Sequence, residues 1–212
     1  MRALKISFIV LASVLFFMSC QKNETPLVVN SVRTDTVFEL VADTIIGLSN
    51  GQPVGVGKFT FYSIESKSVI SDADSNSTKW DIGFRGTTII TNSGNSGPGF
   101  GGAFIYNGTF DELTSISADS IFKVDNAPTA YAIPTGSNKG WYVYDFPTNL
   151  INPIPGRVLV IRTANGNYAK LEIYSYYKGG TPSANVSDDE KLARQRFYTF
   201  RYTYQSDGSK VF

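Results

Sequence analysis

The sequence predicts a compact, antiparallel all-β domain with at most one or two short helices. Short runs rich in Val, Ile, Thr, Phe and Tyr alternate with clusters of Gly, Asn, Asp, Ser and Pro, a pattern typical of strands joined by turns. No long stretch has the apolar period of an amphipathic helix, and no β-α-β alternation is present. The 212 residues are enough for one domain with a substantial core.

Three aromatic runs are expected to be strands, at residues 58–64, 80–85 and 140–146. In the second run, strict alternation places Trp80, Ile82 and Phe84 on one face and the three intervening residues on the other. A hairpin is expected over residues 158–177, where Asn165-Gly166 is the strongest short turn signal. A two-residue type I′ turn there requires positive φ at both Asn165 and Gly166.

The C-terminal part predicts one short helix followed by a closing strand. Ser187 and Glu190 have the spacing of a capping box, which predicts a helix that continues to about Arg194. Residues 196–204 are rich in aromatic side chains and are expected to form a closing strand, and a turn follows at residues 206–208.

The N-terminus has the features of a bacterial lipoprotein signal. Arg2 and Lys5 precede an apolar run at residues 6–18, which is shorter than the ~20 residues that a membrane-spanning helix needs. Residues 17–19 resemble a lipobox and end directly before Cys20, the only cysteine. We expect lipid on Cys20 because this cysteine stands at the end of the apolar run. Two or more acyl chains there would give stable membrane anchoring.

This reading divides the chain into a signal peptide at 1–19, a lipidated tether at 20–35 and a β domain at 36–212. Residues 20–24 weakly resemble the signal that sends lipoproteins of Bacteroidetes to the cell surface. The expected location is therefore the outer membrane, with the domain exposed at the cell surface.

Composition excludes several chemistries. The chain has no histidine, and Met1 and Met18 are removed with the signal peptide. Without imidazole, thioether or free thiol, the mature domain cannot run Ser-His-Asp or Cys-His catalysis or form most transition-metal sites. Its 17 basic and 18 acidic residues leave no basic stripe for nucleic acid. We expect a binding protein and not an enzyme.

Two motifs are interpreted as structural. Gly97, Gly99 and Gly102 match the spacing of a dinucleotide fingerprint, but a β-type run follows where a helix is needed, so we expect a flexible loop or a close approach of two backbone segments. Residues 72–76 have the first spacings of a calcium loop but lack its glycine and final glutamate, so we expect a solvated turn.

Three stretches resemble the HmuY family of haem-binding lipoproteins of Bacteroidetes. They are Lys-Trp-Asp-Ile-Gly-Phe-Arg at 79–85 with the glycine-rich loop after it, the hairpin at 159–177, and the segment 197–202 with the closing turn at 207–209. The resemblance implies a compact all-β fold, capture of haem outside the cell and transfer to a TonB-dependent receptor of the outer membrane. Family members hold the iron between two His or two Met side chains from loops in the middle of the chain.

This sequence has neither ligand type in its mature form, so the resemblance does not supply an iron site. Tyrosinate is a known haem ligand, and the mid-chain candidates for contact with the ligand are Tyr106, Tyr131, Tyr142 and Tyr144. Tyr106 and Tyr131 are preferred for the iron because they border loops. The alternative is a porphyrin held without coordination, by aromatic contacts and by Lys or Arg on its propionates.

A function of another class is also open. An aromatic sheet face could dock a partner receptor, a glycan or another hydrophobic ligand without binding any tetrapyrrole. Most of the 12 tyrosines are expected to pack between strands, and only a minority to line a ligand surface.

Overall fold

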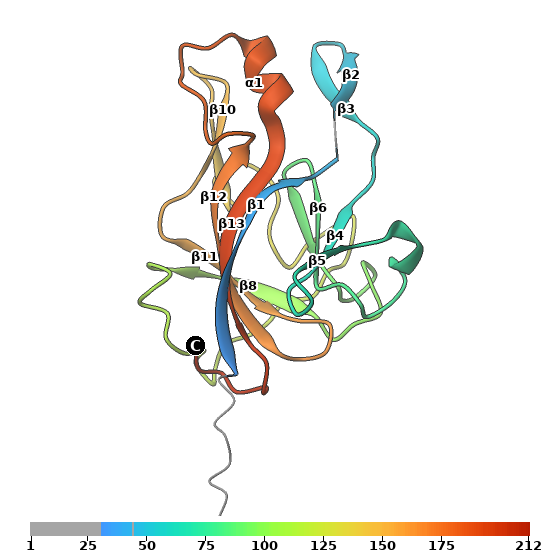
Figure 1. The fold of residues 1–212 in the computed structure, drawn as a ribbon, viewed down its shortest axis with the longest axis vertical. Coiled ribbons are helices and arrows are strands. Elements are labelled where there is room, and N and C mark those ends of the chain that lie inside the picture. The colour runs from blue at the N-terminus through green and yellow to red at the C-terminus, as the bar shows by residue number, and fades with distance from the viewer. Residues whose placement is uncertain (1–30, 44) are drawn as a thin grey trace, which may run out of the picture.

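The computed structural model describes residues 31–43 and 45–212, which form two antiparallel sheets, two hairpins and one α-helix (Figure 1). The predicted fold class is confirmed. The expected signal peptide and Cys20 lie outside the described residues, so their assignment stays a prediction. No helix within the described residues is long and apolar enough to cross a membrane.

The larger sheet has five strands in the order β1-β13-β12-β11-β8. Their bounds are β1 Val32–Val41, β8 Gly102–Asn107, β11 Arg157–Arg162, β12 Tyr168–Tyr177 and β13 Gln195–Gln205. The predicted closing strand is thus β13, and it pairs with both β1 and β12.

The smaller sheet has four strands in the order β5-β4-β6-β7. Their bounds are β4 Thr60–Ser63, β5 Ser68–Ile70, β6 Ile82–Arg85 and β7 Thr88–Thr91. A short 3-10 helix, η1 (Asp72–Asp74), follows β5. Its two carboxylates pair with Lys58 and Lys79, at 3.0 and 2.7 Å, in agreement with a solvated turn.

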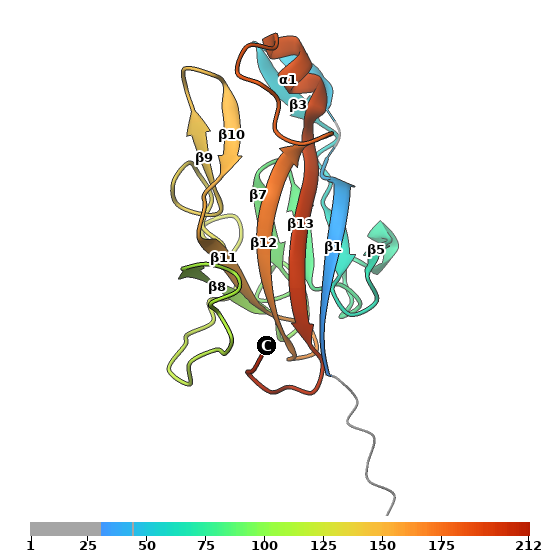
Figure 2. The same cartoon turned by 60° about the vertical axis from the view of Figure 1, so that its left-hand side comes forward.

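Three further elements project at one end of the molecule (Figures 1 and 2). They are the hairpin of β2 (Ile45–Ser49) and β3 (Gln52–Gly55), the hairpin of β9 (Tyr142–Asp145) and β10 (Leu150–Pro153), and helix α1 (Asp188–Arg194). The predicted helix cap is confirmed, because the Ser187 side chain accepts a hydrogen bond from the Glu190 N–H. Glu190 itself pairs with Arg194 and does not complete the capping box.

Aromatic rings join the two sheets across the main core. Phe84 of β6 stacks on Phe200 of β13 with ring centroids 5.5 Å apart, and Tyr62 of β4 meets Phe200 edge-on at 5.8 Å. Such pairs contribute about 0.5–1.5 kcal/mol each beyond the burial of their area. The expectation that most tyrosines pack between strands agrees with the complete burial of Tyr198 and Tyr202.

The first strand, β1, begins at Val32, whereas the predicted tether extends to Asp35. Val32 is opposite Gln205 and Asp35 is opposite Tyr202 in the register of β1 with β13. The sequence interpretation missed these four residues because an edge strand tolerates charged side chains. Arg33 is fixed by a hydrogen bond of 2.6 Å to the Ile64 carbonyl, which ties this end of β1 to the smaller sheet.

The prediction that Trp80 shares one strand face with Ile82 and Phe84 is wrong. Ile82 and Phe84 point into the main core, whereas Trp80 packs in a separate cluster with Phe61 and Ile90. The physical reason is that β6 begins only at Ile82, so the alternation of a strand does not extend back to Trp80.

The hairpin of β11 and β12 is present, but its turn is not the two-residue type expected. Gly166 has φ +88°, whereas Asn165 is not among the residues with positive φ. The Gly166 N–H donates to the Thr163 carbonyl at 3.0 Å, and the Thr163 N–H to the Asn167 carbonyl at 2.8 Å. These bonds define a three-residue loop with a left-handed glycine at its end.

Gly166→Val should therefore destabilise the protein by about 1–3 kcal/mol, since a β-branched residue is strained at positive φ. The strain is purely conformational, because a Cβ built on Gly166 has no atom within 4 Å. Denaturant unfolding measures the loss. Gly166→Asn is the control and should lose less, because Asn tolerates the left-handed region. An unchanged midpoint for Gly166→Val would contradict this turn geometry.

Asp81 is a buried carboxylate that joins three segments. Its two oxygens accept the Ile64 N–H at 2.8 Å and the Ala164 N–H at 2.9 Å. Its backbone carbonyl accepts the Asn92 N–H at 2.9 Å. Burial raises the pKa of the Asp81 carboxyl to about 6, although these N–H donors oppose the rise.

A raised pKa means that the folded state binds this proton more tightly than the unfolded chain does. The resulting stabilisation is largest at low pH and is lost as the pH rises through about 6. Between about pH 4 and about pH 7 we expect wild type to lose about 2–3 kcal/mol of unfolding free energy relative to Asp81→Asn. Urea unfolding at several pH values measures the difference, and a ¹³C titration of Asp81 with a midpoint below about 4 would contradict it.

The glycine-rich loop is a close approach of backbone segments, one of the two expected alternatives. Asn92 organises it: its side-chain amide donates to the Ser77 and Trp80 carbonyls, and its side-chain oxygen accepts the Gly99 N–H, each at 2.8 Å. A Cβ on Gly101 would collide with the Asn92 carbonyl, so a side chain cannot be accommodated there.

Candidate functional site

The three projecting elements surround a cleft of about 360 Å³. The volume falls within the range of about 300–1,000 Å³ that is typical of small-molecule sites. The β2–β3 hairpin, the β9–β10 hairpin, the end of β12 and helix α1 each contribute to its walls. The lining residues are Gly51, Gln52, Pro53, Tyr144, Asn149, Ile151, Tyr177, Asp188, Lys191, Leu192 and Gln195.

Local sequence explains how two of the walls form. Asn50 and Gly51 have φ of +50° and +73° and link the paired residues Ser49 and Gln52. This is the two-residue turn with positive φ at both positions that the sequence interpretation had placed at Asn165-Gly166. The cap on α1 brings Asp188 and Lys191 to the opposite wall.

A chain of hydrogen bonds crosses the cleft from the β9–β10 hairpin to the helix. The Tyr144 hydroxyl donates to Asn149 Oδ1 at 2.6 Å. The Asn149 amide donates to Asp188 Oδ2 at 3.0 Å, and Lys191 Nζ pairs with the other oxygen of Asp188 at 3.1 Å. The Lys191 side chain is only 8% exposed, so this cation is largely removed from water.

The two phenols of the cleft differ in their chemistry. The Tyr177 hydroxyl accepts the Ile151 N–H at 2.8 Å, and burial raises the pKa of this phenol. Tyr177 therefore stays neutral, and at 1% exposure it belongs to the buried floor of the cleft. Tyr144 is 41% exposed, so its oxygen is accessible to a ligand.

The four tyrosines singled out from the sequence do not come together. Tyr144 lines the cleft, whereas its strand neighbour Tyr142 is buried in the main core against Trp141. Tyr106 packs on the cluster around Val158, and Tyr131 packs on the separate cluster that holds Trp80. Tyr106 and Tyr131, the two tyrosines preferred for the iron, thus belong to different clusters, and each stays a prediction as an iron ligand.

Sequence reasoning missed Lys191, Asn149 and Gln52 as cleft residues. The Asn-Gly dipeptide at 50–51 was an available signal for one wall. Nothing in the local sequence links that hairpin to a helix that begins more than a hundred residues later. Within the described residues no group of three or more His, Cys, Asp or Glu could hold a metal ion.

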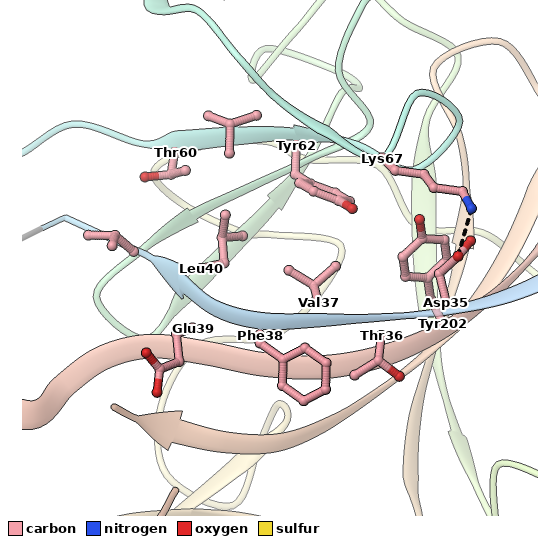
Figure 3. Close-up of a pocket in the computed structure, with 12 residues that line it drawn as sticks. Asp35, Thr36, Val37, Phe38, Glu39, Leu40, Thr60, Tyr62, Lys67 and Tyr202 are labelled. Atoms are coloured by element: carbon pink, nitrogen blue, oxygen red, sulfur yellow. Dashed lines mark hydrogen bonds and ion pairs between the residues drawn. The ribbon is translucent and has the colours of Figure 1, made fainter. Parts of the chain in front are cut away.

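A second concavity, of about 570 Å³, runs along residues 35–41 of β1, the edge strand of the larger sheet, beside β4 and β5 (Figure 3). Lys67 closes one end through an ion pair of 2.7 Å with Asp35. Tyr62 and Tyr202 line it, and burial raises the pKa of both phenols. Phe38 is 75% exposed on β1, so this edge groove carries a large apolar side chain at its rim.

The structure is an antiparallel all-β domain with a cleft at one end that has Tyr144 and Tyr177 among its lining residues. The profile of the HmuY protein family matches residues 56–187, which is more than half of the chain. The chain belongs to the HmuY family. The matched segment includes the β9–β10 side of the cleft and stops directly before α1.

Solved structures of low identity are similar to this chain over most of its length. An HmuY analogue of Tannerella forsythia is 16% identical with a TM-score of 0.46, and 82% of this chain and 96% of that chain are covered. A Bacteroides vulgatus protein provisionally described as HmuY-like and haem-binding is 14% identical, with coverages of 80% and 90% and a TM-score of 0.44. A Bacteroides fragilis protein provisionally described as a lipoprotein is 13% identical, with coverages of 82% and 91% and a TM-score of 0.47. A comparison with curated protein sequences finds no match.

Proposed function

We propose that this protein is a lipid-anchored surface protein that binds haem or a related tetrapyrrole and passes it to a TonB-dependent receptor of the outer membrane. The observation that carries the proposal is the HmuY family match over residues 56–187. The function is binding without catalysis.

The cleft beside α1 is the proposed ligand site. Flat conjugated ligands favour sites with ring faces, apolar walls and a few fixed polar groups. Tyr144 supplies an exposed ring above the buried Tyr177, and Leu192 and Ile151 supply apolar area. Lys191, held in place by Asp188, is the cation available to an acidic group of the ligand.

The position of the anchor supports this choice. β1 begins at the end of the molecule opposite α1 and the two hairpins (Figures 1 and 2). Only 11 residues separate Cys20 from Val32, the first residue of β1. A lipid on Cys20 would therefore hold the opposite end near the membrane and leave the cleft directed outward.

If ferric haem is coordinated in the cleft, the donor is the Tyr144 phenolate. Ferric iron favours an anionic oxygen and can drive loss of the proton. Tyr177 is less suited because burial favours its neutral form. Tyr106 and Tyr131, the donors preferred from sequence, stay as the alternatives.

Titration with haemin tests the ligand class. We expect a saturable, stoichiometric Soret shift with a high-spin, tyrosinate-type ferric spectrum that disappears on reduction with dithionite. Tyr144→Phe should abolish the tyrosinate signature, whereas Tyr106→Phe and Tyr131→Phe, made separately as matched controls, should keep it. If the signature is lost only in Tyr106→Phe or only in Tyr131→Phe, the substituted tyrosine is the iron ligand and Tyr144 is not.

Binding without coordination gives a different pattern. The spectrum then lacks a tyrosinate band in every variant, and Lys191→Gln weakens binding while Tyr144→Phe does not. A low-spin state that survives reduction and all three Tyr→Phe substitutions would contradict the proposed ligand chemistry.

The anchor has its own test. Cys20→Ala should release the protein from membranes or block its processing, because the acyl chains attach at this residue. Metabolic labelling with a palmitate analogue in the native host measures the effect. Label that persists in Cys20→Ala would show that the protein is not lipidated at this residue.

A second candidate function is the binding of an extended partner along the edge groove. The specific observation is that β1 is an edge strand of the larger sheet and carries the exposed Phe38, since a sheet edge can accept an additional strand. The haemin titration decides between the two functions. No saturable Soret change would exclude the tetrapyrrole and favour the edge groove.

A further inference from the structure

A third concavity, of about 420 Å³, is lined by an unusual share of positive charge. It lies beside β8, the edge strand of the larger sheet, and the first residue of β11 lines it. Lys123, Lys139 and Arg157 line it, and no Asp or Glu does. The remaining lining residues are Phe104, Ile105, Asn107, Ala132 and Pro134. We call this concavity the basic pocket.

The three cations have no carboxylate partner among the residues that the structure describes. Eight other Lys and Arg residues among the described residues do form ion pairs, including Arg196 with Asp43 at 3.2 Å. Arg157 donates one N–H to the Gly140 carbonyl at 2.6 Å. A guanidinium has five N–H donors, so most of those on Arg157 remain for a ligand.

Asp125 is a buried carboxylate, and its oxygens accept hydrogen bonds from the backbone. Asp125 accepts the Ala132 N–H at 2.7 Å and the Thr91 N–H at 2.9 Å. Its acceptors are thus directed at the backbone and not at the lysines. Asp125 fixes Ala132, which lines the basic pocket, and thereby helps to order the loop that contains Lys139.

The backbone holds the cations in place. Lys123 forms two hydrogen bonds with Ala103 of β8, at 2.9 and 3.0 Å, so its segment is paired to the sheet edge. Arg157 is opposite Asn107 in the ladder of β11 with β8. Three like charges gathered in one concavity repel each other, and a concave surface focuses their potential on a small volume. An anion in that volume relieves the repulsion.

We propose that the basic pocket binds a small, multiply charged anion through its carboxylate or phosphate groups. The site shares no lining residue with the cleft beside α1 and does not rest on the function proposed for that cleft. Two sources provide the same chemistry: a free anion such as pyrophosphate, or the propionate groups of a tetrapyrrole.

Pyrophosphate is the probe, titrated into the full chain and followed by calorimetry and by ¹H–¹⁵N spectra. We expect saturable binding with shifts around Lys123, Lys139 and Gly140, weakened by salt. Lys123→Gln and Lys139→Gln should each weaken binding about tenfold, the effect of one charge-assisted hydrogen bond. Lys210→Gln is the matched control, a lysine that forms no ion pair in the described residues and does not line the pocket, and it should bind as wild type does.

Absence of saturable binding, or equal weakening in Lys210→Gln, would overturn the proposal. Mesoporphyrin and its dimethyl ester then identify the source. Displacement of pyrophosphate by the free acid but not by the ester supports the site and assigns it to tetrapyrrole carboxylates. Displacement by neither supports a site for a free anion. Haemin binding that persists without any pyrophosphate binding would refute this inference alone and leave the proposed function of the cleft intact.

Discussion

Three buried polar side chains, Asp81, Asn92 and Asp125, hold the irregular segments of this protein in place. Buried backbone groups must be paired, and loops lack the ladder partners that strands have. Asp81 receives N–H groups from the end of β4 and from the β11–β12 turn, and Asp125 receives those of Thr91 and Ala132. Asn92 connects the glycine-rich loop to the segment before β6. The walls of the basic pocket depend on this arrangement through Ala132.

Aromatic contacts hold the two sheets together. Phe84, Tyr62 and Phe200 fix the distance between the two sheets, and Tyr198 extends the contact toward Trp141 at 5.2 Å. With the sole cysteine at position 20, no disulfide can form within the described residues, so packing and the buried hydrogen bonds provide the stability. The β2–β3 hairpin and α1 project beyond this core, whereas the β9–β10 hairpin is rooted in it through Tyr142 and Leu150 (Figure 2).

The absence of histidine from the chain, and of methionine from its described residues, constrains the proposed function more than any residue that is present. The described residues offer phenols and cations in place of imidazole and thioether groups. The cleft provides an accessible phenol at Tyr144 and a largely buried cation at Lys191, and the basic pocket provides three further cations. A ligand with acidic side groups on a flat ring system matches both kinds of group.

The sequence by itself determined the all-β class, the closing strand, the cap of α1 at Ser187 and the absence of imidazole chemistry, because these depend on composition or on residues a few positions apart. The predicted strand face of Trp80 was wrong, because that face depends on where β6 begins. The predicted two-residue turn at Asn165-Gly166 was also wrong: the loop has three residues, and Asp81 accepts a hydrogen bond from the Ala164 N–H within it. The sequence could not select Tyr144 among the tyrosines. Only the tertiary structure brought Gly51, Tyr144 and Lys191 to one cleft, and Lys123, Lys139 and Arg157 to one pocket, because those approaches arise from the packing of segments far apart in the chain.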